Sequence, residues 1–341
     1  MTTISVCVPV YNGAAFIVET LECIAAQTFA DFNVLVSVDR SDDSSLQACG
    51  VFATDRRFQI IEQPVRLGWI ANVNALIDRV EAPFFCITPH DDLLDPRYLE
   101  AMHGVHRSDP TAACVFSDIE CFGERDGHIL QADILGARHE RVLDVLLNHY
   151  AAVAFRGVVR RQGASDRPYV PMGIPEDFAS DTAWMIGIAQ RGTLRRVPEL
   201  LYRKRFIATS VHAAWSRWTQ SELLRLYAAL VAACTRLALD GATDATEREE
   251  LMVAGLLRAA GYTKQHGWGT PGTPFEVASV VSNFSALTTD FERISDPMET
   301  LRRTHVAVLQ EGLKHNAMLA PIRSTWRNGV MQSLQRLLGA T

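Results

Sequence analysis

Two adjacent carboxylates, Asp91 and Asp92, follow a short apolar run over residues 82–88 that is typical of a buried strand. Acidic residues at the C-terminal end of a central strand lie where open α/β sheets bind ligands. Two neighbouring carboxylates repel each other unless a positive charge shares the site, and a divalent cation that carries a phosphate supplies one. Either aspartate could instead cap the helix that begins near Pro96. The residues alone leave both interpretations open.

Three more polar or aromatic segments follow predicted strands, and each adds a group that a nucleotide diphosphate requires. Their residues are, in order, Pro9, Val10 and Tyr11 in Val8-Pro-Val-Tyr-Asn-Gly13; Asp39; and Arg66, which opens a helix carrying Asn74. His90 precedes the carboxylate pair. An aromatic ring stacks on a base, an acid accepts a hydrogen bond from the base, and arginine binds phosphate. Asn74 also suits a local hydrogen bond within its helix, and Tyr11 and Asp39 also suit a turn and a cap.

Strand and helix patterns alternate over the first 120 residues, which predicts a doubly wound, mainly parallel α/β sheet. The expected strands are 4–10, 32–38, 58–61, 84–88 and 112–116, and the expected helices are 14–27, 44–53, 68–80 and 96–106. Because the carboxyl ends of parallel strands share one edge, the four segments that carry Tyr11, Asp39, Arg66 and the Asp91–Asp92 pair should lie together.

The rest of the chain is expected to complete the sheet and then become helical. We expect a helix at 142–149, a strand at 153–159, a loop at 162–175, a helix at 182–190 and an edge strand at 193–197. Further helices are expected at 217–239, 245–260, 274–285, 295–315 and 320–338. This pattern predicts a catalytic domain at 1–212 and a helical C-terminal region at 213–341.

Composition excludes several classes of protein. The 341-residue chain is 48% hydrophobic and 21% charged, with a formal net charge of -6, which argues against nonspecific nucleic-acid binding. No signal peptide or membrane-spanning run is visible, and the seven cysteines form no CxxC pair. These features predict a cytoplasmic protein with reduced thiols.

The ordered motifs resemble those of the family 2 glycosyltransferases, inverting enzymes with the GT-A fold. The resemblance extends over about residues 3–212 and includes a strand ending in V-P-V-Y-N-G, a strand ending in an acid, and H-D-D. Further on come an acid before an apolar helix ending in R-G, at Asp181–Gly192, and an L-Y-x-x-R segment at Leu201–Arg205. No single motif is specific, whereas five in order are.

The resemblance implies a role for each matching residue. Pro9, Val10, Tyr11 and Asp39 would contact the nucleobase and ribose, and Arg66, Asn74 and His90 would lie near the nucleotide-sugar. Asp91 would reach the ribose or sugar, Asp92 would bind Mg²⁺ or Mn²⁺, and Asp181 would be the catalytic base. Arg203, Lys204, Arg205 and His212 would lie in a flexible segment that closes over the diphosphate, with His212 as a second metal ligand.

The implied reaction transfers a sugar from a nucleotide-diphosphate donor, expected to be a UDP-sugar, to an acceptor hydroxyl. Asp181 would take the hydroxyl proton, while the metal and the cationic segment would stabilise the departing diphosphate. This chain departs from the family pattern at Arg40 and Ser180, and the Glu176–Asp177 pair is a rival for the base.

Two other functions remain open at this point. A sugar nucleotidyltransferase shares a related sheet but requires a glycine-rich basic loop, where this chain has the short neutral Tyr11–Ala14. The second alternative is an inactive nucleotide-sugar-binding scaffold. The last predicted helix is amphipathic, which suits packing on other helices, a homodimer interface or peripheral contact with a membrane.

Overall fold

The computed structural model describes residues 2–148, 152–208, 215, 217–248, 250–252, 254, 255 and 258. Backbone contacts divide the chain into two compact units. The first combines Met1–Gly136, Ala151–Gly173 and Ser180–Ser210, and the second combines Ala137–Tyr150, Ile174–Ala179 and Val211–Thr341. The boundary predicted at residue 212 stays a prediction.

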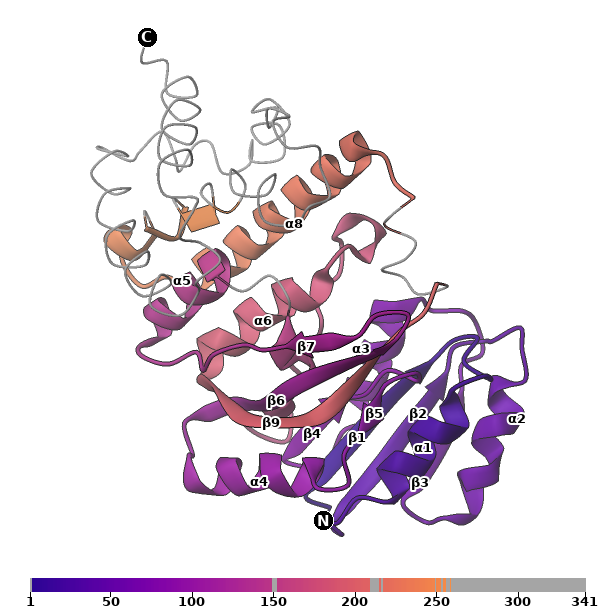
Figure 1. Cartoon of the computed structure of the whole chain (residues 1–341). Coiled ribbons are helices and arrows are strands. Elements are labelled where there is room, and N and C mark those ends of the chain that lie inside the picture. Colours follow the sequence, from indigo (N-terminus) through magenta and orange to yellow (C-terminus); the bar gives the residue numbers. More distant parts are fainter. Residues whose placement is uncertain are drawn as a thin grey trace. The chain divides into compact units, whose positions relative to one another are not determined.

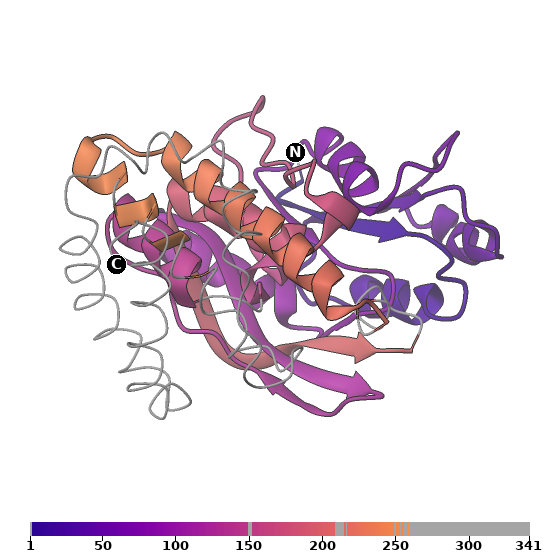
Figure 2. The same cartoon turned by 90° about the horizontal axis from the view of Figure 1, so that it is seen from above.

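The N-terminal half of the first unit is a parallel sheet, as predicted. Its strands are β1 (Ile4–Val10), β2 (Phe32–Val38), β3 (Phe58–Glu62) and β4 (Phe84–Ile87), in the order β3-β2-β1-β4. Helices α1 (Ile17–Ala25) and α2 (Ser45–Gly50), with the 3₁₀ turn Val51–Thr54, lie on one side, and α3 (Trp69–Asp78) lies on the other (Figures 1 and 2). The two-sided burial explains why these strands are continuously apolar.

The second half of the sheet mixes strand directions. β8 (Val158–Arg160) runs antiparallel between β4 and β6 (Ala112–Gly123), and β9 (Thr193–Phe206) runs parallel to β6. Two short strands, β5 (Leu93–Leu94) and β7 (Gly127–Ile129), pair antiparallel with β9 and β6. Helix α6 (Ser180–Arg191) lies above the β6–β9 pair in Figure 1, and α4 (Tyr98–Ser108) lies below it.

Three predicted strands differ from the structure, and the one expected at 112–116 continues to Gly123. Residues 153–159 were expected to form one strand, but Val153–Arg156 is a 3₁₀ turn and only Val158–Arg160 joins the sheet. The strand expected at 193–197 continues to Phe206 and lies between β6 and β5, so it is not an edge strand. A bulge carries Pro198 and Glu199 out of register, because Ser117 pairs with Val197 while Asp118 pairs with Leu200. Proline cannot donate to the ladder, which explains why the sequence pattern seemed to end there.

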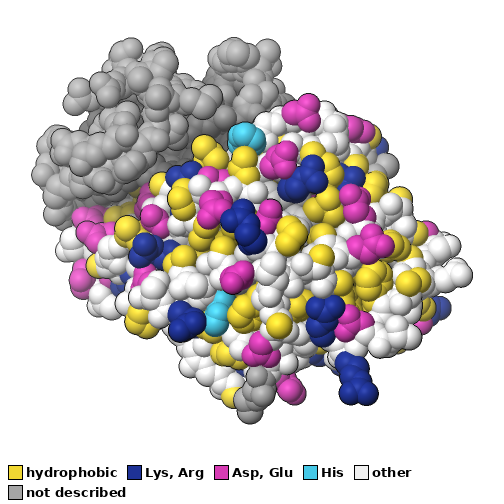
Figure 3. All heavy atoms as spheres, turned by 60° about the horizontal axis from the view of Figure 1, so that its bottom comes forward, with side chains coloured by type: hydrophobic (Ala, Val, Ile, Leu, Met, Phe, Trp, Pro, Cys, Tyr) yellow, Lys and Arg dark blue, Asp and Glu magenta, His cyan; other side chains and the backbone are white. Residues whose placement is uncertain are grey.

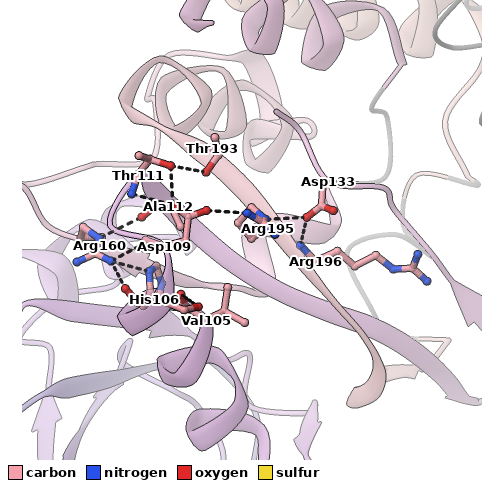
Figure 4. Close-up of polar contacts among 11 residues, drawn as sticks. Val105, His106, Asp109, Thr111, Ala112, Asp133, Arg160, Thr193, Arg195 and Arg196 are labelled. Carbon is pink, nitrogen blue, oxygen red and sulfur yellow. Dashed lines mark hydrogen bonds and ion pairs between the residues drawn. The ribbon is translucent and has the colours of Figure 1, made fainter. Parts of the chain in front are cut away.

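Ion pairs and hydrogen bonds join the N-terminal ends of β6 and β9 (Figure 4). The Arg195 guanidinium contacts Asp109 Oδ2 at 2.7 Å and Asp133 Oδ1 at 3.2 Å. Arg160 donates to backbone carbonyls at the end of α4 and the start of β6. These contacts lie at the opposite ends of the strands from the carboxylate pair.

The second unit is helical where it is described. It contains α5 (Arg138–Asn148), the 3₁₀ turn Pro175–Asp177 and α8 (Gln220–Asp240). α8 begins with a capping box between Thr219 and Glu222, and it confirms the helix predicted at 217–239. The helices predicted at 274–285, 295–315 and 320–338 lie outside the described residues, as does the surface proposed for a membrane or a homodimer.

Every helix in the described part of the chain is too short or too polar to span a bilayer. On the face shown in Figure 3, acidic and basic side chains are interspersed with small hydrophobic areas. That face carries no single-sign field of the kind that attracts a polyanion.

Gly157 follows the 3₁₀ turn Val153–Arg156 and packs closely against β6. A Cβ at Gly157 would lie 2.5 Å from Cys114 Sγ and 2.6 Å from the Val115 carbonyl oxygen. Gly157→Ala should therefore lower the free energy of unfolding by about 1–3 kcal/mol. The matched control is Gly187→Ala in α6, where an added Cβ meets nothing within 4 Å. It should leave stability unchanged or raise it by up to about 1 kcal/mol. Equal melting temperatures for the two variants in thermal unfolding would contradict this account.

Candidate functional site

The loop after β1 is held against the loop after β2. Pro9 and Val10 are buried in β1, with Val10 opposite Val38 of β2. The Gly13 N–H donates to Ser45 Oγ at 2.8 Å, and the Ala14 N–H donates to Asp43 Oδ2 at 3.0 Å. These hydrogen bonds fix the turn that carries Tyr11.

The aromatic ring and the arginine predicted for nucleotide binding lie together. The Arg66 guanidinium carbon is 3.9 Å from the centroid of the Tyr11 ring, and the Tyr11 hydroxyl donates to Asp42 Oδ2 at 3.3 Å. A guanidinium over a tyrosine face is a cation–π contact. A flat heterocycle could stack on the same two groups.

Asp39 supports this arrangement from β2. Asp39 is 2% exposed, and its carboxylate accepts the Leu67 N–H at 2.6 Å and the Gly68 N–H at 2.9 Å. Gly68 has φ +87°, which favours glycine. Asp39 therefore fixes the turn that carries Arg66. Each carboxylate oxygen has a second lone pair, which leaves an acceptor available for a ligand.

Both ends of the Asn74 amide hydrogen-bond to Val170, which is distant in sequence, so the bond is not the local one within its helix that the sequence also suited. Its Nδ2 donates to the Val170 carbonyl at 3.0 Å, and its Oδ1 accepts the Val170 N–H at 2.9 Å. Asn74 therefore holds the predicted loop at 162–175, and this geometry supports a structural role more than a contact with a nucleotide-sugar.

His90 lies against the turn after β1. A Cβ at Gly13 would lie 2.4 Å from His90 Cδ2, so only glycine permits this approach. The Thr20 hydroxyl also donates to the His90 carbonyl at 2.8 Å. The tip of β4 is thereby placed beside the tip of β1.

Asp92 is buried and surrounded by protein donors. It is 2% exposed; Oδ1 accepts the Arg205 N–H at 2.9 Å, and Oδ2 accepts the Tyr202 hydroxyl at 2.7 Å and Arg156 Nε at 3.4 Å. Burial and the charge of Asp92 raise the pKa of Tyr202 well above its usual value, which keeps the phenol a donor. Protein donors therefore contact both oxygens of Asp92, and the metal role predicted for it stays a prediction.

Asp91 is chemically the more suitable metal ligand of the pair. Its side chain accepts no hydrogen bond from the side chain or backbone of another described residue, and burial and neighbouring Asp92 raise its pKa. Among the described residues, no three His, Cys, Asp or Glu side chains gather closely enough to hold a metal by themselves. Mg²⁺ is commonly bound by one or two carboxylates together with substrate phosphates, so Asp91 fits such a shared site.

Arg203, Lys204 and Arg205 lie in strand β9, whereas the sequence predicted a flexible segment there. Successive side chains of β9 point to opposite faces of the sheet. Arg203 contacts Glu120 at 2.7 Å, and Arg205 contacts Glu19 at 2.5 Å and the Asp91 carbonyl at 3.0 Å. Lys204 shares the opposite face with Tyr202, whose hydroxyl reaches Asp92. His212 lies outside the described residues.

Asp181 lies in the first turn of α6, where the helix dipole favours a carboxylate. Its Oδ1 accepts the Thr182 N–H at 2.9 Å. Burial raises the pKa of Asp181, while the charges of Arg156 and Lys204 act in the opposite direction. The rival pair Glu176–Asp177 has φ values of 55° and 53° and belongs to the second unit.

Sequence reasoning did not identify Arg156 or Tyr202 and did not separate Lys204 from its neighbours. The buried Tyr202 shows which residues of β9 share its face, and that alternation selects Lys204 over Arg203 and Arg205. This alternation could not be used at the sequence level, because the predicted strand ended at residue 197 and β9 continues to Phe206. Arg156 follows a buried Phe155 in a segment that was predicted to be a strand, and no sequence signal singles it out.

The N-terminal half of this chain matches a known protein family. Residues 5–161 match the family described as Glycosyl transferase family 2. Glycosyltransferase GlyG from Streptococcus pneumoniae is 28% identical over 127 residues, 37% of this chain and 42% of GlyG. Putative glycosyltransferase EpsH from Bacillus subtilis is 26% identical over 159 residues, 46% of this chain and 44% of EpsH. The matched regions thus span less than half of either relative.

Solved structures show the same fold at low sequence identity. The 1–349 fragment of S. aureus TarS in complex with UDP-GlcNAc has a TM-score of 0.66 and 14% identity, covering 97% of this chain and 89% of that chain. The mannosyltransferase PcManGT from Pyrobaculum calidifontis, in complex with GDP-Man and Mn²⁺, has a TM-score of 0.51 and 16% identity, covering 99% and 88%. Together with the strand order described above, these matches establish a GT-A fold, and residues 5–161 of this chain match glycosyl transferase family 2.

Proposed function

We propose that this chain is a metal-dependent, inverting glycosyltransferase that moves a sugar from a nucleotide-diphosphate donor to an acceptor hydroxyl. The observation that carries the proposal is the convergence of Tyr11–Arg66, Asp39 and Asp91 at the tips of adjacent parallel strands. This edge of the sheet is the usual ligand side of such folds. The match of this region to glycosyl transferase family 2 supports the same conclusion.

The donor is expected to be a UDP-sugar. The base would stack on Tyr11 and Arg66, and Asp39 would accept a hydrogen bond from the base. Asp91 would share a divalent cation with the diphosphate. That cation, Mg²⁺ or Mn²⁺, would neutralise charge on the departing diphosphate. Relatives of similar fold were solved with UDP-GlcNAc and with GDP-Man and Mn²⁺, which supports this class of donor.

Asp181 is the proposed general base. A carboxylate positioned on the acceptor side can remove the hydroxyl proton as the new glycosidic bond forms. Attack from the face opposite the leaving diphosphate inverts the anomeric carbon. The acceptor would be a carbohydrate or glycoconjugate, and the cytoplasm would be the site of the reaction.

The geometry does not favour a nucleotidyltransferase. Such an enzyme binds a triphosphate on free backbone N–H groups after the first strand. The N–H groups of Gly13 and Ala14 are already bound to Ser45 and Asp43.

A calorimetric titration with UDP and GDP, with and without Mn²⁺, tests the proposed donor site and shows whether Asp91 or Asp92 binds the metal. Asp91→Asn should abolish the Mn²⁺ dependence of binding. It should also leave the metal-free protein as stable or more stable, because it removes a buried like-charge contact.

Asp92→Asn is the matched variant and should instead lower the free energy of unfolding by at least about 2 kcal/mol, since it disturbs a carboxylate bound by three donors. The absence of Mn²⁺-dependent binding of either nucleotide would refute the proposed function. Loss of Mn²⁺ binding in Asp92→Asn alone would reverse the two assignments.

Asp181→Asn tests the proposed base separately. The change should reduce turnover about a hundred- to ten-thousand-fold, because the amide cannot accept the hydroxyl proton. Donor affinity should be retained. The measurement is release of nucleoside diphosphate with acceptor present, and Asp177→Asn is the control. If Asp177→Asn lost turnover and Asp181→Asn kept it, the base would be in the Glu176–Asp177 pair.

The pH dependence of kcat should reflect the buried environment of Asp181. Burial raises its pKa above that of an ordinary aspartate, so the protonated and inactive form persists to higher pH. Turnover should therefore fall as pH decreases through this raised value, at a higher pH than a solvent-exposed aspartate would give. A rate profile at saturating substrate provides the test, and a flat profile down to the ordinary aspartate range would contradict it.

A further inference from the structure

Arg156 has hydrogen-bonding capacity that the protein does not use. Its side chain is only 10% exposed, and its backbone is fixed because Tyr98 donates to its carbonyl. Nε contacts Asp92 at 3.4 Å. The four N–H groups on the two Nη atoms donate to no residue within the described part of the chain. Buried guanidinium groups ordinarily have their donors bonded, so these N–H groups are available to a ligand.

Lys204 brings a second cation to the same side of the sheet. It shares the face of β9 with Tyr202, and its Nζ lies 4.9 Å from the Phe206 ring centroid. No carboxylate of a described residue lies within ion-pair distance of it. Burial and the like charge of Arg156 lower the pKa of Lys204 to about 8, although Asp92 and Asp181 act in the opposite direction. Two neighbouring cations in a poorly solvated environment are stabilised when an anion binds between them.

The carboxylates nearby do not use all the donors of these two cations. Asp92 already accepts from three protein donors, so it does not saturate Arg156. Asp181 receives the Thr182 N–H and forms no ion pair with Arg156 or Lys204 within the described residues.

We propose that Arg156 and Lys204 form an oxyanion subsite that binds a carboxylate carried by the sugar of the donor, so that the preferred donor is a nucleotide-linked uronic acid. This inference rests on the proposed function. The transferred sugar must lie between the diphosphate at Asp91 and the base at Asp181, and the charges of both cations act on Asp181. Arg156 would supply a planar pair of N–H groups, which suits bidentate binding of a carboxylate.

The experiment compares donors whose sugars carry a carboxylate or a hydroxymethyl group at C6, with the bare nucleoside diphosphate as reference. The full chain with Mn²⁺ is titrated calorimetrically with UDP, UDP-glucose and UDP-glucuronate, and with GDP, GDP-mannose and GDP-mannuronate. Within the nucleotide series that binds, the uronate should bind about tenfold more tightly than the neutral sugar, as expected for charge-assisted hydrogen bonds.

Two variants test the residues independently. Arg156→Gln and Lys204→Gln should each abolish the preference for the uronate and leave the affinity for the bare diphosphate unchanged. The Lys204 side chain makes no hydrogen bond to a described residue, so its variant remains informative if Arg156→Gln unfolds. Arg195→Gln is the control, because it removes a cation from the same strand at the distant end shown in Figure 4. It should keep the preference.

Three outcomes would overturn the inference. Equal affinity for uronate and neutral sugar would show that no oxyanion subsite exists. A loss of diphosphate affinity as large as the loss of uronate affinity in both variants would assign the cations to the diphosphate. Failure of every nucleotide to bind would refute the proposed function itself, and that result is distinct from a lost preference.

Discussion

The buried carboxylate of Asp92 is the interaction on which the rest of the site depends. It joins three elements that are distant in sequence: the tip of β4, strand β9 through Tyr202 and the Arg205 N–H, and the turn that carries Arg156. A buried carboxylate is tolerated only when donors surround it, so these three elements must be in place together. The same contacts leave Asp91 as the member of the pair with free lone pairs.

This constraint also separates the two faces of β9. Because Tyr202 is held toward Asp92, Lys204 lies on the side of Arg156 and Asp181, and Arg203 and Arg205 lie on the other side. Arg205 still supports the site, since its Nε binds the Asp91 carbonyl. In the proposed function, the face of β9 that carries Tyr202 and Lys204 contributes to substrate binding. The opposite face stabilises the loop that carries Asp91 and Asp92, through Arg205.

The sequence was sufficient for the parallel half of the sheet, because apolar strands and amphipathic helices alternate there with short turns. It also placed Tyr11, Asp39, Arg66 and Asp91 at one edge, since parallel strands end on the same side. It could not separate Asp91 from Asp92, because two adjacent aspartates differ only in what surrounds them after folding. It also missed the second half of β9, since the bulge at Pro198 interrupts the strand pattern.

A crystal structure with Mn²⁺ and UDP would show which of the two aspartates binds the metal and where the nucleotide lies. We expect the metal to contact Asp91 and the diphosphate oxygens, with the base stacked against Tyr11 and Arg66, while Asp92 keeps its bonds to Tyr202 and the Arg205 N–H. A metal bound by Asp92, with the Tyr202 hydroxyl displaced, or a nucleotide located away from the tips of β1, β2 and β4, would contradict it.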